Sequence, residues 1–167
     1  MTDKPSLSYS LTKKDRDFML LALHLGRRGL GGVAPNPAVG CVIAKQGKII
    51  GRGWTQPGGR PHAETEALLQ AGTESRGAKV YVTLEPCVHQ GQTGPCAEAL
   101  IQAGVIEVHI ALKDPDSRVA GRGIEMLESA GIVVMLYEDE INTLAAELNS
   151  GFLTCLLYTS DAADELR

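Results

Sequence analysis

The segment Pro61-His62-Ala63-Glu64 is followed by Glu85-Pro86-Cys87 and by Cys96, which stands nine positions after Cys87. Together they offer one imidazole nitrogen and two thiolate sulfurs, which are ligand types that zinc prefers in a tetrahedral site. A catalytic zinc site has three protein ligands and leaves the fourth position for water. We therefore predict that His62, Cys87 and Cys96 hold one zinc ion per chain.

Glu64 stands two residues after His62 and adds a carboxylate that is not needed as a ligand. Zinc deaminases carry the signature H-x-E followed by P-C-x-x-C, in which the glutamate transfers protons. This chain matches the first half and the Pro-Cys pair, but it places eight residues between the two cysteines. Zinc can lower the pKa of a bound water to about 7, and a nearby carboxylate could move the water proton to a ring nitrogen and then to ammonia. We predict that Glu64 is the catalytic residue of such a hydrolysis.

A structural zinc site is the main alternative. It would normally take a fourth protein ligand, and His89, between the two cysteines, could supply one. Glu64 argues against this alternative, because a structural site has no use for it. Two other interpretations of the function also stay open. The chain could be a deaminase of another pyrimidine or purine base or nucleoside, or a non-catalytic zinc-binding domain.

Composition indicates one soluble globular domain. The chain has 167 residues, of which 44% are hydrophobic and 22% charged, with a net charge of −4. Without a cluster of Lys and Arg, a nucleic-acid partner is not expected. The sequence has neither an apolar run long enough to span a membrane nor a signal peptide, so we expect a cytoplasmic protein that has no membrane partner. With two of the four cysteines assigned to metal, a disulfide framework is not expected.

The pattern of apolar residues and turn signals predicts alternating helices and strands. Thr12 and Asp15 resemble a helix cap, and Gln46-Gly47 is typical of a hairpin turn. The predicted helices cover residues 13 to 26 or 29, 61–71, 95–103, 121–130 and 138–149. The predicted strands cover 39–44, 48–54, 79–84, 105–112 and 132–136. This rhythm indicates an α/β fold, a three-layer α/β/α sandwich around a mixed sheet of about five strands.

The two ends of the chain differ from its centre. Residues 1–11 are expected to be a leader, and 12–154 a zinc-dependent deaminase domain. Residues 155–167 resemble the translation of a sequencing adapter, and such an end should be set aside in fold reasoning. We therefore expect a non-native tail at 155–167 and a natural gene product that continues past Thr154.

Several segments together resemble one known family. They are Pro35–Gly40, Gly59–Glu64, Thr83–Cys87, His89–Cys96, Asp114–Asp116 and Ala120–Gly123. They are similar to the deaminase domain of the bifunctional riboflavin-biosynthesis deaminase/reductase, a branch of the cytidine deaminase-like zinc deaminases. The long interval between the cysteines, with His-x-Gly-x-Thr inside it, is typical of this branch. The resemblance covers roughly residues 12–154.

The resemblance implies a reaction and a partner. The family hydrolyses the 2-amino group of 2,5-diamino-6-(5-phosphoribosylamino)pyrimidin-4(3H)-one, which gives 5-amino-6-(5-phosphoribosylamino)uracil and ammonia. It also implies a cytidine deaminase-like fold, one zinc ion per chain, and a homo-oligomer. In the family a reductase domain follows, and Asn149–Leu153 resembles the connector into it, whereas the domain itself is missing from this chain.

The resemblance also assigns residues to the substrate. Asn36 would hydrogen-bond the pyrimidine, and His89 and Thr93 would line the ribose-phosphate side. Thr55 and Gln92 are substrate-side candidates at which the chain departs from its relatives, since many of these have His at the first position and Lys or Arg at the second. Arg60 could take the phosphate in place of the missing cation, because a phosphate normally pairs with a cation or with several N–H donors.

Overall fold

The computed structural model describes residues 10–89 and 94–154. Two predicted substrate residues, Gln92 and Thr93, lie outside these described residues, as do the predicted tail and nearly all of the predicted leader. Five strands form one mixed sheet in the order β2-β1-β3-β4-β5. They are β1 (Gly40–Lys45), β2 (Lys48–Trp54), β3 (Lys79–Val82), β4 (Glu107–Ile110) and β5 (Val133–Leu136). β1 pairs antiparallel with both β2 and β3, whereas β3, β4 and β5 run parallel to one another.

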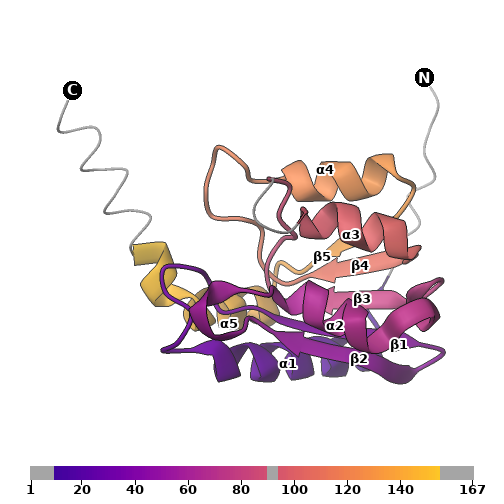
Figure 1. Ribbon diagram of the computed structural model, residues 1–167, viewed down its shortest axis with the longest axis horizontal. Helices are drawn as coiled ribbons and strands as arrows, with labels where there is room; N and C mark the ends of the chain where they lie inside the picture. The colour runs from indigo at the N-terminus through magenta and orange to yellow at the C-terminus, as the bar shows by residue number, and fades with distance from the viewer. Residues whose placement is uncertain (1–9, 90–93, 155–167) are drawn as a thin grey trace.

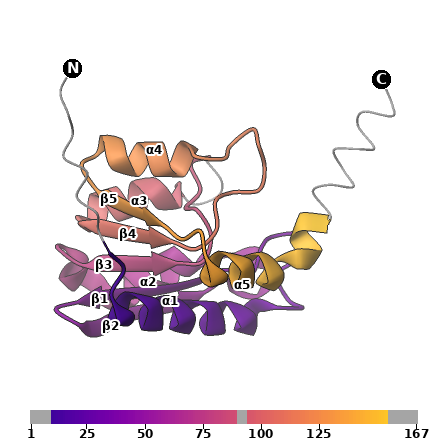
Figure 2. The same cartoon turned by 180° about the vertical axis from the view of Figure 1, so that it is seen from behind.

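Helices cover both faces of this sheet (Figures 1 and 2). One face carries α1 (Lys13–Gly26) and α5 (Glu140–Leu148), and the other carries α2 (Ala63–Ala71), α3 (Cys96–Ala103) and α4 (Arg122–Ser129). Short 3-10 turns lie at Arg27–Gly29, Pro57–Gly59 and Gly72–Ser75. The predicted three-layer α/β/α sandwich around a five-stranded mixed sheet is confirmed.

Each face of the sheet has its own apolar core, because successive side chains of a strand point to opposite sides. On β1, Cys41 and Ile43 belong to the core under α2, α3 and α4, together with Leu100. Val42, on the same strand, belongs to the core under α1 and α5, together with Met19. None of the helices in the described part of the chain is long and apolar enough to cross a membrane.

Local signals explain how the first elements begin and turn. The Thr12 hydroxyl accepts a hydrogen bond from Asp15 N (3.1 Å), and the Asp15 carboxylate accepts one from Thr12 N (2.9 Å). This reciprocal pair is a capping box, which satisfies two backbone donors at the start of α1. The β1–β2 hairpin turns at Gln46 (φ 50°) and Gly47 (φ 74°), and two positive φ angles suit the right-handed twist of the strands.

Two glycines let α2 lie directly on β2. A Cβ at Gly53 would stand 2.2 Å from the Ala63 carbonyl oxygen, and a Cβ at Gly51 would stand 2.3 Å from the Ala67 carbonyl oxygen. Such distances are far inside van der Waals contact, so any larger residue would push the helix away. The pair therefore fixes where the N-terminus of α2 lies relative to the sheet.

The start of α2 differs from the prediction. Pro61 was expected in the first turn, but the helix begins at Ala63, and Pro61 precedes it. The reason is that His62 has extended backbone angles (φ −70°, ψ 160°) and serves as the N-cap, while its carbonyl accepts a hydrogen bond from Glu66 N (3.2 Å). The strand predicted at 105–112 is also shorter, since β4 covers only Glu107–Ile110.

Candidate active site

Three segments bring the predicted metal ligands together near the carboxyl end of the central strand, β3. His62 caps α2, Cys87 lies in the loop after β3, and Cys96 is the first residue of α3. The His62 Nδ1 atom lies 3.3 Å from Cys96 Sγ and 3.8 Å from Cys87 Sγ, and all three ligand atoms lie within 4.8 Å of one another.

These distances can be compared with what zinc requires. Zinc–sulfur bonds of about 2.3 Å and zinc–nitrogen bonds of about 2.0 Å, arranged as a tetrahedron, imply a nitrogen–sulfur edge of about 3.5 Å. The two measured separations lie on either side of this value. The three residues therefore fit a zinc ion with a tetrahedral coordination that has one position left over.

The surroundings favour an anionic sulfur at Cys87. The hydrogen bond from the Cys96 thiol, with further ones from His62 and the Cys96 N–H, lowers the pKa of Cys87 to about 4 although burial opposes this. The backbone N–H of Cys96 lies 3.3 Å from the Cys87 sulfur, at the N-terminus of α3, where the helix dipole stabilises negative charge. The pKa of Cys96 is raised, because its thiol donates the proton shared between the two sulfurs.

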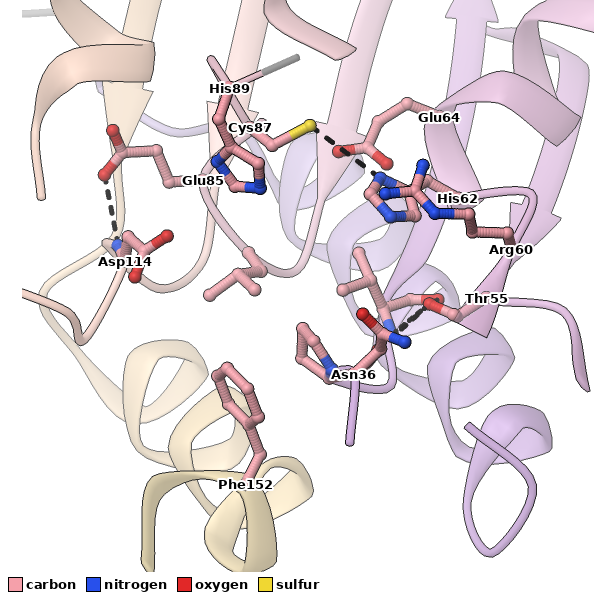
Figure 3. Close-up of a pocket in the computed structure, with 13 residues that line it drawn as sticks. Asn36, Thr55, Arg60, His62, Glu64, Glu85, Cys87, His89, Asp114 and Phe152 are labelled. Carbon is pink, nitrogen blue, oxygen red and sulfur yellow. Dashed lines mark hydrogen bonds between the residues drawn. The ribbon is translucent and has the colours of Figure 1, made fainter. Parts of the chain in front are cut away.

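Glu64 lies beside these ligands in the first turn of α2, with 4% of its surface exposed. Figure 3 shows its carboxylate next to His62 and Cys87. Burial raises the pKa of Glu64 to about 7, and hydrogen bonds from its own backbone N–H and from Cys96 offset this only in part. A carboxyl group with a pKa near neutrality can both accept and donate a proton at working pH.

A cavity of ≈ 190 Å³ opens in front of this group (Figure 3). His62, Glu64 and Cys87 line its metal end. Four of the predicted substrate residues also line the cavity. They are Asn36, Thr55, Arg60 and His89.

The loop before β1 supplies part of the cavity wall, and Thr55 holds it in place. The Thr55 hydroxyl accepts a hydrogen bond from Val39 N (2.9 Å) and donates one to the Pro37 carbonyl (3.2 Å). Asn36 packs against Gly59, where a Cβ would stand 2.0 Å from the Asn36 Nδ2 atom. Asn36 lines the cavity, and the Thr55 hydroxyl is already occupied by the backbone.

Glu85 has a role that the sequence did not reveal. It is buried at the end of the segment after β3, and its two carboxylate oxygens accept four backbone hydrogen bonds. The donors and distances are Asp114 N (3.1 Å), Gly121 N (3.0 Å), Gly123 N (2.8 Å) and Ile124 N (3.3 Å). Glu85 thus ties the loop after β4 and the N-terminus of α4 to the site, and this places Asp114 in the cavity wall.

The sequence carries no short-range signal for this contact, because Glu85 and its backbone donors are about thirty to forty residues apart. Gly123 is required there, because a Cβ would stand 2.3 Å from the Pro86 carbonyl oxygen. The other cavity residues to which the sequence assigned no role are Asp114, Phe152 and the apolar residues Pro37, Val39 and Leu84.

Comparison with known proteins is consistent with this geometry. Residues 12–112 match the family model of the cytidine and deoxycytidylate deaminase zinc-binding region. The chain is 48% identical over 145 residues to the riboflavin biosynthesis protein RibD of Haemophilus influenzae, covering 85% of this chain and 38% of that protein. It is 49% identical over 140 residues to RibD of Escherichia coli, covering 84% and 38%. The chain therefore spans less than half the length of these relatives.

Solved structures show the same relationship. RibD of Acinetobacter baumannii superposes with a TM-score of 0.81 at 50% identity, covering 85% of this chain and 40% of that one. A diaminohydroxyphosphoribosylaminopyrimidine deaminase/5-amino-6-(5-phosphoribosylamino)uracil reductase of Thermotoga maritima gives a TM-score of 0.79 at 38% identity, covering 86% and 41%. The chain therefore belongs to the zinc-binding cytidine and deoxycytidylate deaminase family, and it resembles the deaminase part of the RibD proteins.

Proposed function

We propose that this chain hydrolyses the 2-amino group of 2,5-diamino-6-(5-phosphoribosylamino)pyrimidin-4(3H)-one, giving 5-amino-6-(5-phosphoribosylamino)uracil and ammonia in riboflavin biosynthesis. The observation that carries the proposal is the spacing of His62, Cys87 and Cys96 beside the buried carboxyl group of Glu64 at the end of a cavity. A purely structural metal site would not need that carboxyl group. The similarity to RibD proteins over the deaminase part supports this choice of substrate.

In this proposal the three metal ligands and Glu64 have separate tasks. His62, Cys87 and Cys96 hold zinc, and zinc when bound supplies an acidified water as the nucleophile. The Glu64 carboxylate would accept a proton from the attacking water and donate it to the ring nitrogen next to the reacting carbon. It would then carry the second proton of that water, now a hydroxyl group on the ring carbon, to the departing amine, so that the carbon–nitrogen bond breaks and ammonia leaves as a neutral molecule.

The rest of the cavity orients the substrate. The Asn36 amide offers one acceptor and two donor hydrogens, which suits the alternating donors and acceptors on a pyrimidine edge. Arg60 lies in the wall near His62, and a guanidinium group can form paired hydrogen bonds with a phosphate. His89 is exposed at the cavity wall. We assign it, with Gln92 and Thr93, to the ribose-phosphate side.

Metal analysis tests the ligand assignment. The purified chain should carry about one zinc ion, and Cys87→Ser should lose most of it, because a serine hydroxyl is a much poorer zinc ligand than a thiolate. Cys41→Ala is the matched control, since Cys41 is another buried thiol, close to Glu64 but outside the ligand set. Full zinc retention in Cys87→Ser would refute the assignment.

Ammonia release tests the activity. The zinc-loaded chain should release ammonia from the phosphoribosylaminopyrimidine, and a chelator should abolish the release. A panel of free aminopyrimidines, aminopurines and their nucleosides tests the alternative substrates, and a chain that prefers one of these would overturn the proposed substrate. The expectations of a homo-oligomer and of a cytoplasmic location remain predictions, to be tested by analytical ultracentrifugation and by cell fractionation.

A further inference from the structure

A short helical segment at residues 150–154 follows α5 and lies against the cavity. Backbone N–H of Leu153 donates to the Asn149 carbonyl (2.9 Å), and the Thr154 hydroxyl donates to the Ser150 carbonyl (2.9 Å), so the segment has internal hydrogen bonds of its own. In sequence it is distant from every metal ligand. In space it approaches the cavity from the side opposite Cys87 and Glu64 (Figure 3).

Asn149 anchors the beginning of this segment to the cavity loop. The side chain is 3% exposed, and its Oδ1 atom accepts a hydrogen bond from Ala38 N (2.9 Å). Ala38 lies between Pro37 and Val39, which both line the cavity. The anchor therefore ties the end of α5 to the same loop that Thr55 holds from the other side.

Phe152 projects from the anchored segment into the cavity. It is only partly buried, and its neighbours in the cavity wall include the apolar side chains of Pro37 and Leu84. Phe152 and Asn36 also line a second cavity of ≈ 190 Å³, together with Leu30 and Leu148. The two side chains thus border both cavities, and the partly exposed ring of Phe152 can contact an occupant of the first.

We propose that Phe152 is a substrate-contacting residue, whose ring packs on the part of the pyrimidine that is remote from the departing amine. The inference rests on the proposed function, because it takes the amine to be at the zinc end, next to Glu64. A planar heterocycle in that position turns its far side toward the wall opposite Cys87 and Glu64, where Phe152 lies. An aromatic ring is suited to such a contact, since aromatic pairs gain energy beyond the burial of their area.

The remote position of the contact determines its kinetic signature. A contact that is the same in the ground state and the transition state changes KM and leaves kcat unaltered. Phe152→Ala should therefore raise KM by about 3- to 10-fold and change kcat by less than about two-fold, with zinc content unchanged. Because the contact is to the ring and not to the phosphate, the same ratio of KM values should be found with the dephosphorylated substrate.

Leu153→Ala is the matched control. Leu153 is a partly buried apolar residue of the same helical segment, and it lines none of the cavities described above. It should leave KM and kcat near wild-type values. An equal rise in KM in Leu153→Ala and Phe152→Ala would overturn the proposal, because the effect would then come from loosening the segment.

The test uses the zinc-loaded chain, with steady-state ammonia release and calorimetric binding of the uracil product as readouts. If Phe152→Ala folds poorly, Phe152→Leu keeps the apolar bulk without the aromatic ring, and a wild-type KM and product affinity in that variant would contradict an aromatic contact. Unchanged values in a folded Phe152→Ala overturn the inference alone. A wild-type chain that neither binds the product nor releases ammonia overturns the proposed function, and the inference falls with it.

Discussion

Glu64 is placed where a carboxylate is least stable as an anion. It is buried next to the sulfurs of Cys87 and Cys96, and both burial and the nearby Cys87 thiolate raise the pKa of Glu64. A protein that kept a carboxyl group there only for packing would do better with Gln or Leu, because a buried unpaired charge is costly. The position is therefore best explained by proton transfer.

Replacing Glu64 with Gln should separate chemistry from metal binding. The amide keeps the shape of the side chain but cannot carry a proton, so kcat should fall by about 10²- to 10⁴-fold. Zinc content should stay near that of the wild type, because Glu64 is not assigned as a ligand. Ammonia release and metal analysis on the same samples are the measurements.

The control for this change is Glu66→Gln, in the same turn of α2 but away from the cavity lining, and it should keep full activity. Unchanged turnover in Glu64→Gln would remove the proposed mechanism. Loss of zinc would instead show that Glu64 supports the metal site.

Features of the site that depend on residue type alone could be predicted from the sequence. Imidazole and thiolate have few uses in common apart from metal binding, so His62, Cys87 and Cys96 identified themselves, and the structure brings them together. The role of Glu85 could not be predicted, because a carboxylate that accepts four hydrogen bonds depends on a loop about thirty residues further along the chain. Phe152 has no chemical signature either, since an aromatic residue in a sequence is as typical of an apolar core as of a binding site.

Among the elements, α4 depends on a single buried carboxylate at its start. The Glu85 carboxylate accepts hydrogen bonds from Gly123 N and Ile124 N in the first turn of α4, and from Asp114 N and Gly121 N in the preceding loop. In Glu85→Gln the amide nitrogen would face backbone donors with no acceptor. Leaving such groups unsatisfied costs about 1–3 kcal/mol, and we expect urea unfolding to show a loss of stability of this size.

The same change should also disturb the cavity, because the loop that carries Asp114 loses its anchor. Glu128→Gln, on the exposed side of α4, is the control and should change neither stability nor KM. If Glu85→Gln were as stable as the wild type, the four hydrogen bonds would contribute nothing to the placement of α4.

The close contact between α2 and β2 can be tested with a single substitution. Gly53→Ala would put a methyl group 2.2 Å from the Ala63 carbonyl oxygen, so the first turn of α2 must move. Overpacking of this kind costs about 1–3 kcal/mol, and because His62 caps that turn, the affinity for zinc should fall as well. Thermal unfolding and competition with a chromogenic chelator measure the two effects.

Gly32→Ala is the control for this substitution. Its backbone is compatible with alanine, and the nearest atom to the added Cβ is 3.9 Å away. A Gly53→Ala protein with wild-type zinc affinity would show that α2 can shift without moving its cap.

For the whole molecule, the layered fold could be predicted because the rhythm of the chain alternates strands with amphipathic helices. The β3-α3-β4-α4-β5 run gives parallel strands with both crossover helices on one face, as right-handed connections require. The exact strand ends could not be predicted. Apolar residues such as Val105 and Leu112 continue past the ladder of β4, and apolar character alone does not show where hydrogen-bonded pairing stops.

The core under α1 and α5 contains a polar cluster that no sequence pattern predicted. His109, on β4, is 1% exposed. Its Nε2 atom lies 2.5 Å from Glu107 Oε1 and its Nδ1 atom lies 3.1 Å from the Tyr137 hydroxyl. Asp15 Oδ1 is 3.9 Å from Nε2, and the ring of Tyr81 packs on the imidazole with centroids 4.5 Å apart. The cluster thus links Asp15 on α1 to Tyr81 on β3, to Glu107 and His109 on β4, and to Tyr137 directly after β5.

This cluster should make the stability of the whole chain depend on pH. Burial lowers the pKa of His109 even though the carboxylates of Glu107 and Asp15 oppose this effect, so the folded protein resists protonation of the ring. Below pH of about 6.5 the unfolded chain takes up a proton that the folded chain does not, and stability should fall with a slope of up to about 1.4 kcal/mol per pH unit. Above that pH this group makes no contribution.

Urea unfolding of the wild type and of His109→Gln between pH 7.5 and pH 5.5 measures the effect. The mutant should be less stable at every pH, because it loses the ring contacts, but its stability should fall less steeply as the pH is lowered. In the metal-free protein Glu64 affects the pH dependence of stability in the opposite sense, because its raised pKa makes the folded state more stable as the pH is lowered. This contribution is the same in the wild type and in His109→Gln, so it cancels in the comparison. Parallel curves for the two proteins would mean that His109 takes up its proton as readily in the folded chain as in the unfolded one, and that burial among these groups does not control its titration.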